Sequence, residues 1–170
     1  MFTTEITSDT LTSDNPIHQR LLFPYIEVSK VIEGDLLEIG CGLGRGVELL
    51  AHKVTSYVAI DKNTRLIEQL QKDFPKIKFI QQNIPPLTGI ADNTFDYVVS
   101  FQVIEHIEND HLFLKEIHRV LKPGGKVIIT TPNIKLSLTR NPWHVREYTA
   151  EGLEKLMAQY FSKITPKGVF

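Results

Sequence analysis

The segment from Leu36 to Gly46, LLEIGCGLGRG, constrains the fold more than any other part of the sequence. A short apolar run leads into four glycines at every second position, 40, 42, 44 and 46. Glycine adopts positive φ at no steric cost and lets a ligand lie against the main chain. We therefore expect a buried strand that turns into a ligand-binding loop and then into a helix.

The spacing of these glycines argues against a dinucleotide-binding loop. The dinucleotide fingerprint is Gly-x-Gly-x-x-Gly directly after a strand. Counted from Gly40, the third glycine would fall on Arg45, and counted from Gly42 it would fall on Val47. Glu38 stands just before the loop, where it suits a cationic or hydrogen-donating ligand better than a pyrophosphate. A nicotinamide-dependent oxidoreductase is the rival hypothesis, which a failure to bind NADH would exclude.

Short apolar runs alternate with amphipathic segments along most of the chain. Helices are expected at 16–32, 44–52, 63–73, 110–121 and 149–160, and strands at 36–39, 57–60, 78–81, 97–101 and 126–131. Asn63 and Thr149 are the expected N-caps of two of these helices. Alternation at this spacing predicts an α/β three-layer sandwich, a mostly parallel sheet with helices on both faces.

Length, charge and cysteine content bound the class of protein. The 170 residues suffice for one domain, expected over 15–170, and residues 1–14 are expected to form a mobile arm. The net charge of −1 disfavours nucleic acid as a partner. No apolar run approaches the ~20 residues of a membrane helix, and the first residues lack a signal-peptide pattern. We expect a cytoplasmic monomer or homodimer without a disulfide, and no ligand spacing in the sequence predicts a metal site.

The second expected strand ends in VAID and places Asp61 at its carboxyl end. A carboxylate about 20 residues after the glycine loop is positioned to accept hydrogen bonds from ribose hydroxyls. The ligand indicated is a nucleoside with a charged tail that is not a phosphate. S-adenosylmethionine is the commonest such molecule.

Together these segments make the chain resemble the class I, seven-strand S-adenosylmethionine-dependent methyltransferases, whose fold is Rossmann-like. The resemblance extends over residues 16–170 and rests on LLEIGCGLGRG, VAIDKN, FIQQNIPPL, NTFDYVVSFQVIEHI and LKEIHRVLKPGGKVIITTPN, in that order. It implies that S-adenosylmethionine is the cofactor and S-adenosylhomocysteine the product. The implied cofactor contacts are Arg20, Tyr25, Glu38, Gly40, Cys41, Gly42, Gly44, Asp61, Lys62, Asn83, Ile84, Ser100, Phe101 and Gln102. Asn83 stands where the family usually has an acidic residue, and its side-chain oxygen can still accept a hydrogen bond from the adenine amino group.

The same resemblance implies methyl transfer by in-line displacement, for which the protein holds donor and acceptor in line. Glu105 and His106 in VIEHI, and His144 in NPWHVREYT, are the candidate catalytic residues, because a base assists transfer to a hydroxyl. We expect a small-molecule or glycan acceptor, methylated at oxygen. The alternative for Glu105 and His106 is a structural role in orienting the loop. The alternative for the whole chain is a regulatory or scaffold module that binds the cofactor without catalysis.

The seven-strand pattern continues after its fifth strand into a sixth strand and a final antiparallel strand beside the fifth. The segment FSKITPKGVF, residues 161–170, resembles the start of the sixth strand, and the sequence ends there. We therefore expect a sheet that lacks the C-terminal strand or strands of the family pattern. An exposed fifth-strand edge would favour association of two copies, whereas the cofactor half, 34–131, does not depend on the missing strands.

Overall fold

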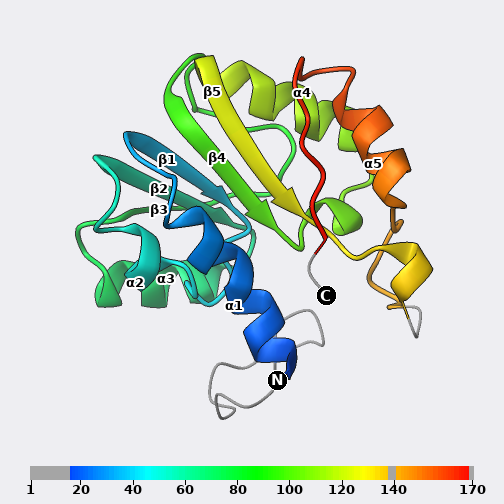
Figure 1. The fold of residues 1–170 in the computed structure, drawn as a ribbon. Helices are drawn as coiled ribbons and strands as arrows, with labels where there is room; N and C mark the ends of the chain where they lie inside the picture. Colours follow the sequence, from blue (N-terminus) through cyan, green and yellow to red (C-terminus); the bar gives the residue numbers. More distant parts are fainter. Residues whose placement is uncertain (1–15, 138–140, 169–170) are drawn as a thin grey trace.

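The computed structural model describes residues 16–137 and 141–168, with side chains from residue 19 onward. The predicted N-terminal arm, residues 1–14, lies outside this part of the chain (Figure 1). No helix in the described ranges is long and apolar enough to span a membrane.

A parallel sheet with the order β3–β2–β1–β4–β5 forms the middle layer (Figure 1). Its strands are β1 (Asp35–Ile39), β2 (Ser56–Asp61), β3 (Lys78–Gln81), β4 (Phe95–Phe101) and β5 (Leu121–Thr130). Each neighbouring pair is parallel, with β1 between β2 and β4. The chain therefore builds the sheet outward in one direction to β3 and in the other from β4. Ligands of open parallel sheets bind beyond the carboxyl ends of the strands at such a reversal.

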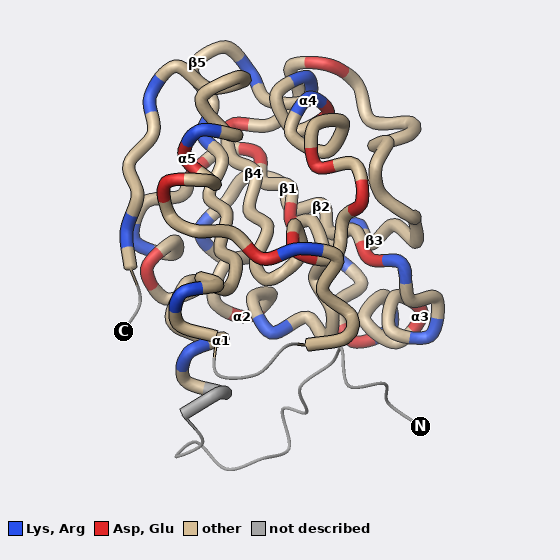
Figure 2. Tube along the Cα trace, turned by 90° about the vertical axis from the view of Figure 1, so that its right-hand side faces the viewer, with Lys and Arg blue, Asp and Glu red and all other residues tan. Residues whose placement is uncertain are grey.

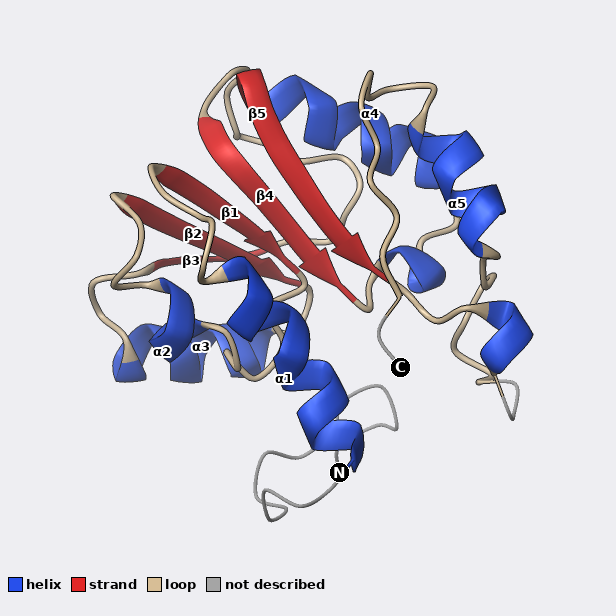
Figure 3. Cartoon of the chain, viewed as in Figure 1, coloured by secondary structure: helices blue, strands red, loops and turns tan. Residues whose placement is uncertain are grey.

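Helices cover both faces of the sheet, which confirms the predicted three-layer arrangement (Figure 3). One face carries α1 (Pro16–Val28), α2 (Val47–Leu50) and α3 (Thr64–Asp73), and the other carries α4 (Asp110–Val120) and α5 (Ala150–Met157). Two 3-10 helices, η1 (Ile104–His106) and η2 (Ile134–Leu136), follow β4 and β5. Asn63 and Thr149 act as the predicted N-caps, with side chains that accept hydrogen bonds from the backbone of Leu66 and Gly152.

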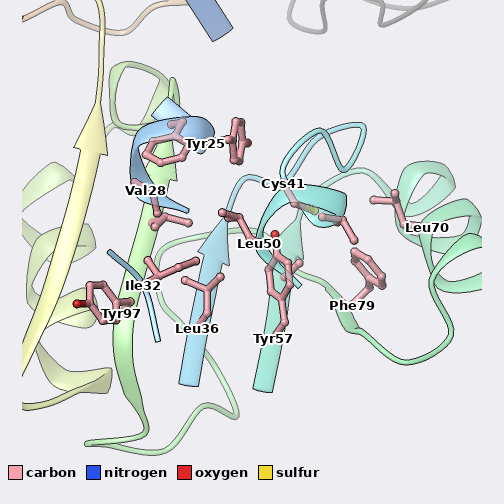
Figure 4. Close-up of a cluster of buried hydrophobic side chains, with 14 of the residues drawn as sticks. Tyr25, Val28, Ile32, Leu36, Cys41, Leu50, Tyr57, Leu70, Phe79 and Tyr97 are labelled. Atoms are coloured by element: carbon pink, nitrogen blue, oxygen red, sulfur yellow. The ribbon is translucent and has the colours of Figure 1, made fainter. Parts of the chain in front are cut away.

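Successive residues of β1 point to opposite faces of the sheet. Leu36 is fully buried among residues of α1 and α2, and Val28 and Ile32 lie near it in Figure 4. Leu37 and Ile39 are buried on the opposite face, against α4. Both faces of β1 are covered, which explains why Leu36, Leu37 and Ile39 are all apolar, while Glu38 is buried with hydrogen-bond partners.

Some predicted boundaries differ from the structure. The helix expected at 44–52 is reduced to α2, because residues 42–46 form turns in which Gly42 and Gly44 have positive φ. β5 begins earlier than residue 126, since Leu121 already pairs with Phe95 before an irregularity in the register.

Residues 161–168 form no strand, so the prediction of a sixth strand at this position is wrong. Pro166 has no N–H to donate to a sheet, and the segment lacks the regular apolar positions of a strand. Phe161 instead packs against the core on the α4 face, with its ring 5.8 Å from that of His118. Within the described residues β5 pairs only with β4, and the sheet has fewer than seven strands, as expected.

The connection between β3 and β4, residues 82–94, is held against α4 by hydrogen bonds from its backbone to Glu116 and Arg119. Arg119 Nε donates to Glu116 Oε1 at 2.9 Å, and its two Nη atoms donate to the carbonyls of Ile90 and Leu87. Glu116 Oε2 accepts from the backbone N–H of Leu87 at 2.9 Å. The Arg119 guanidinium holds the pKa of Glu116 below its ordinary value. This clamp positions a loop that reaches the carboxyl ends of the strands.

Candidate functional site

A cavity of about 320 Å³ opens at the carboxyl ends of β1, β2 and β4, where the strand order reverses. It is lined by Leu21, Tyr25, Gly40, Cys41, Gly42, Leu43, Arg45, Asp61, Lys62, Asn63, Asn83, Ile84, Phe101, Gln102, Val103, His106 and Ile107. A wider hollow of about 700 Å³ lies beside Gly34 and Asp96, at the amino ends of the strands. The glycine loop lines the first cavity, which makes it the candidate ligand site.

The glycine loop follows β1 and turns tightly at the edge of this cavity. Gly40 has φ +79, and a Cβ there would lie 2.3 Å from a methyl group of Val103. Gly42 has φ +51, and a Cβ there would meet nothing within 4 Å. The first glycine is therefore needed for close packing, while the second leaves its backbone open to a ligand.

Asp61, at the end of β2, is held in place by hydrogen bonds from two backbone N–H groups. Its Oδ2 accepts from Gly42 N at 2.9 Å, and its Oδ1 accepts from Asn63 N at 2.8 Å. Each carboxylate oxygen has further lone pairs. The side chain therefore presents a fixed pair of acceptors to the cavity, suited to two neighbouring hydroxyl groups.

Glu38 does not line the cavity but lies beneath it, 1% exposed. The Tyr25 hydroxyl donates to its Oε1 at 2.7 Å, and the Tyr57 hydroxyl donates to its Oε2. Burial raises the pKa of Glu38, although the two tyrosine hydrogen bonds oppose that shift. The Tyr25 ring also packs on Gly46, where an added Cβ would lie 2.2 Å from it. Glu38 thus connects α1 to β1 and β2 under the site.

Cys41 lines the cavity and is 2% exposed. Burial raises the pKa of its thiol, so the group is a neutral thiol at neutral pH. The thiolate rather than the thiol is the nucleophile, so Cys41 is not expected to react. It supplies a small apolar surface at the site.

The end of β4 forms another wall of the cavity. Gln102 has φ +57, and it is fixed there by bonds from its backbone N to the carbonyl of Thr130 (2.9 Å) and from Nε2 to Thr130 Oγ1 (3.2 Å). A left-handed conformation at a residue other than glycine is costly and is concentrated at functional sites. Ser100 is fully buried behind this wall and does not line the cavity.

His106, on η1, lines the cavity, and Glu105 and His144 lie beside it without lining the cavity. Ligand atoms of these three side chains all lie within 4.8 Å of one another. His106 Nδ1 lies 2.9 Å from the carbonyl oxygen of Trp143. A carbonyl only accepts, so Nδ1 carries the proton and Nε2 of the neutral ring is free of one.

Glu105 is fully buried, and burial raises the pKa of its carboxyl group. Oε2 accepts a hydrogen bond from Thr131 Oγ1 at 2.9 Å, while no protein group bonds to Oε1. The backbone carbonyl of Glu105 accepts from the N–H groups of Val145 and Arg146, at 2.8 and 3.3 Å. These bonds attach the segment after β5 to η1, which gives Glu105 the orienting role considered from the sequence as well as its place in the cluster.

His144 is held by its own segment. Its Nδ1 lies 2.7 Å from Glu147 Oε1, and its Nε2 lies 3.1 Å from Asn141 Nδ2. The amide donates, so Nε2 accepts and Nδ1 donates to the carboxylate. Hydrogen bonds from Ser137 and then from His144 hold the pKa of Glu147 below its ordinary value.

The structure brings most of the predicted site residues together around one cavity. Those that line it are Tyr25, Gly40, Cys41, Gly42, Asp61, Lys62, Asn83, Ile84, Phe101, Gln102 and His106. Those that do not are Arg20, Glu38, Gly44, Ser100, Glu105 and His144. Arg20 is exposed, and the next residue, Leu21, takes the place expected for it. Leu21 lies one helical turn before Tyr25, and that spacing could have indicated it.

Residues 37–129 match the family model described as a methyltransferase domain. That match covers more than half of the chain, and the five-strand order and the site geometry agree with it. The chain belongs to the class I S-adenosylmethionine-dependent methyltransferase family.

Two curated relatives illustrate the match. The "Probable S-adenosylmethionine-dependent methyltransferase Rv3030" of Mycobacterium tuberculosis is 36% identical over 128 residues, which are 72% of this chain and 46% of the relative. The ubiquinone biosynthesis O-methyltransferase of Rickettsia typhi is 33% identical over 121 residues, 69% of this chain and 47% of the relative. The chain thus spans about half the length of these curated relatives.

A solved structure supports the fold. The PH0226 protein of Pyrococcus horikoshii has a TM-score of 0.74 at 24% sequence identity, covering 96% of this chain and 89% of that one.

Proposed function

We propose that this chain transfers a methyl group from S-adenosylmethionine to a hydroxyl oxygen of a small-molecule or glycan acceptor. The observation that carries the proposal is that the glycine loop, Asp61 and His106 all line one cavity. A cofactor held by the glycine loop and Asp61 would share this cavity with His106.

The residues present fit S-adenosylmethionine. Asp61 offers two fixed acceptors for ribose hydroxyls, and the open backbone at Gly42 lets a ligand lie against it. Ile84 and Phe101 supply apolar wall surface, and the neutral thiol of Cys41 avoids a second charge. When bound, the cofactor supplies a methyl group that its sulfonium already activates. The chain's own contribution is to hold the two reactants in line and exclude water.

Oxygen as the methylated atom is supported by the cluster of Glu105, His106 and His144, of which His106 lines the cavity. A hydroxyl must lose its proton in the transfer, and the site offers groups that can accept one. Several similar curated proteins are ubiquinone biosynthesis O-methyltransferases. Their name supports oxygen as the methylated atom.

A small acceptor is supported by the charge distribution. Lys and Arg are interspersed with Asp and Glu along the described chain (Figure 2), and the net charge of the sequence is −1. Proteins that bind nucleic acid instead concentrate basic residues on one face.

The alternative is a module that binds the cofactor and does not methylate. The [4+2]-cyclase SpnF, with a TM-score of 0.67 at 22% identity, has this fold and is named for a reaction other than methyl transfer. Fold alone does not determine the reaction. Tight cofactor binding without turnover on any acceptor would favour this alternative.

The test begins with calorimetric titration of S-adenosylmethionine and S-adenosylhomocysteine into the wild type, Asp61→Ala and Asp73→Ala. Asp73, at the end of α3, is exposed and outside the cavity, and so controls for loss of a carboxylate. We expect micromolar binding that Asp61→Ala abolishes and Asp73→Ala preserves. An acceptor screen with phenols, catechols and sugars, read by formation of S-adenosylhomocysteine, then tests transfer. Absence of binding to the folded wild type would contradict the proposal.

A further inference from the structure

The cluster of Glu105, His106 and His144 has the composition of a metal site. Two imidazoles and one carboxylate form the donor set of catalytic zinc sites and of non-haem iron sites. Their ligand atoms lie within 4.8 Å of one another, so small side-chain movements would place all three around one ion. Glu105 adds a second observation, because its Oε1 is buried and bonds to no protein group.

The surroundings of both histidines match those of metal ligands. A metal-bound histidine donates its other ring N–H to a carbonyl or carboxylate, which fixes the tautomer and directs the second nitrogen to the ion. His106 Nδ1 donates to the carbonyl of Trp143, and His144 Nδ1 donates to Glu147. Nε2 is therefore the nitrogen without a proton in each ring, and in His144 it accepts a hydrogen bond from the Asn141 amide.

We propose that Glu105 Oε1, His106 Nε2 and His144 Nε2 bind a divalent transition-metal ion beside the cavity wall that His106 forms. Nitrogen donors favour Zn²⁺, Co²⁺ or Fe²⁺ over Mg²⁺ or Ca²⁺, which prefer oxygen ligands. Three protein ligands leave at least one coordination position open, and His106 lines the cavity from which an acceptor would reach it.

Two neighbouring groups affect whether such an ion can bind. The Asn141 amide, which donates to His144 Nε2, lies on the same segment and would have to turn away when the ion binds. The positive charge of Arg146 is paired with Asp110, with Nη1 and Oδ2 2.6 Å apart. That pairing lowers the repulsion that an ion would otherwise meet from this segment.

The ion would give the cluster a definite role in the proposed methyl transfer. A hydroxyl that coordinates a divalent cation loses its proton to solvent at a lower pH than a free one. This role rests on the proposed function. Binding of the ion does not, so the two can fail separately.

The test is titration of CoCl₂ and ZnCl₂ into protein stripped of metal by a chelator, without S-adenosylmethionine. We expect one ion per chain, with visible Co²⁺ absorption bands of low-coordinate nitrogen and oxygen ligation. Glu147→Ala should weaken binding roughly 10–100-fold, because it removes the partner that orients His144. His144→Gln should weaken it further. His52→Gln changes an exposed histidine outside the cluster and should leave binding unchanged.

Thermal unfolding of each variant establishes that it is folded without reference to any ligand. Ion binding that is absent from the wild type, or equally strong in folded His144→Gln, would overturn the proposal. S-adenosylhomocysteine titration reports separately on the proposed function. Ion binding without cofactor binding would therefore contradict the methyl transfer and leave the metal site standing.

Discussion

The Tyr25 hydroxyl donates a 2.7 Å hydrogen bond to Glu38 Oε1, so the leading helix is tied to a buried carboxylate of the central strand. Tyr25 also lines the cavity, whereas Glu38 lies beneath it. One side chain thus joins the wall of the site to its foundation. This contact explains why an acidic residue precedes the glycine loop even though it does not line the cavity.

Replacing Tyr25 with Phe keeps the ring and removes the donor. We expect the free energy of unfolding to fall by about 1–3 kcal/mol, since a buried carboxylate loses one of its two tyrosine donors. Affinity for S-adenosylhomocysteine should fall roughly tenfold, or ~1.4 kcal/mol, because α1 is less firmly held. Denaturant unfolding and calorimetry measure the two effects.

The matched control is Tyr97→Phe. The Tyr97 hydroxyl donates to the carbonyl of Val31, and this residue does not line the candidate site. It should lose stability without losing ligand affinity. Equal affinity in the two variants would show that the contact between Tyr25 and Glu38 does not support the site.

Gly40→Ala should be far more harmful than Gly124→Ala. Both glycines have positive φ, +79 and +81, so each alanine incurs roughly 1–2 kcal/mol of backbone strain. At Gly40 the new Cβ would also lie 2.3 Å from Val103, whereas at Gly124 it would meet nothing within 4 Å. Ligand affinity should be lost only in Gly40→Ala. Similar melting temperatures and affinities for the two variants would contradict this account of the loop.

The Glu116–Arg119 pair should make stability depend on pH. Arg119 lowers the folded-state pKa of Glu116 below its ordinary value of 4.5. The stabilisation is therefore complete well above pH 4.5 and is lost as the pH falls through the lowered folded-state pKa. Glu116→Gln should cost roughly 1.5 kcal/mol at neutral pH, the lower end for a charged hydrogen bond.

Denaturant unfolding at a series of pH values measures this effect. The difference in unfolding free energy between wild type and Glu116→Gln should shrink as the pH falls from about 4.5 through the lowered folded-state pKa of Glu116. Glu68→Gln, on the exposed side of α3, is the control. A difference that stays constant with pH would mean that the charge on Glu116 does not contribute.

His106→Gln should separate turnover from cofactor binding. We expect the rate of methyl transfer to fall ~10²–10⁴-fold, the usual contribution of a general acid or base. Affinity for S-adenosylhomocysteine should change little, since Asp61 and the glycine loop remain in place. His111→Gln on α4, whose ring contacts Tyr160 rather than the cavity, is the control. An unchanged rate in His106→Gln would assign the residue a structural role.

The amino-acid pattern is sufficient to predict the layers of this fold and the edge of the sheet at which the site lies. Apolar runs spaced by amphipathic segments define a parallel sheet covered on both faces, and parallel strands end at a common edge. Gly40, Asp61 and Gln102 each follow a strand, so their positions along the chain were enough to predict that they meet.

Which side chains line the cavity and which lie beneath it depends on how the chain packs in three dimensions. Glu38 and Gly40 are two residues apart, yet one is buried under the site and the other lines it, because the chain turns at the glycine. The short α2 and the irregular segment at 161–168 likewise depend on turns and on packing rather than on local pattern.

The cluster of Glu105, His106 and His144 is the clearest case of a feature that depends on contacts between distant segments. His144 is separated from His106 by β5 and its flanking segments, and no ligand spacing in the sequence predicted a metal site. The two rings nevertheless lie 5.0 Å apart, because the backbone carbonyl of Glu105 accepts hydrogen bonds from the segment that carries His144. Contacts between distant segments have no local periodicity, and only the folded chain brings these ligands together.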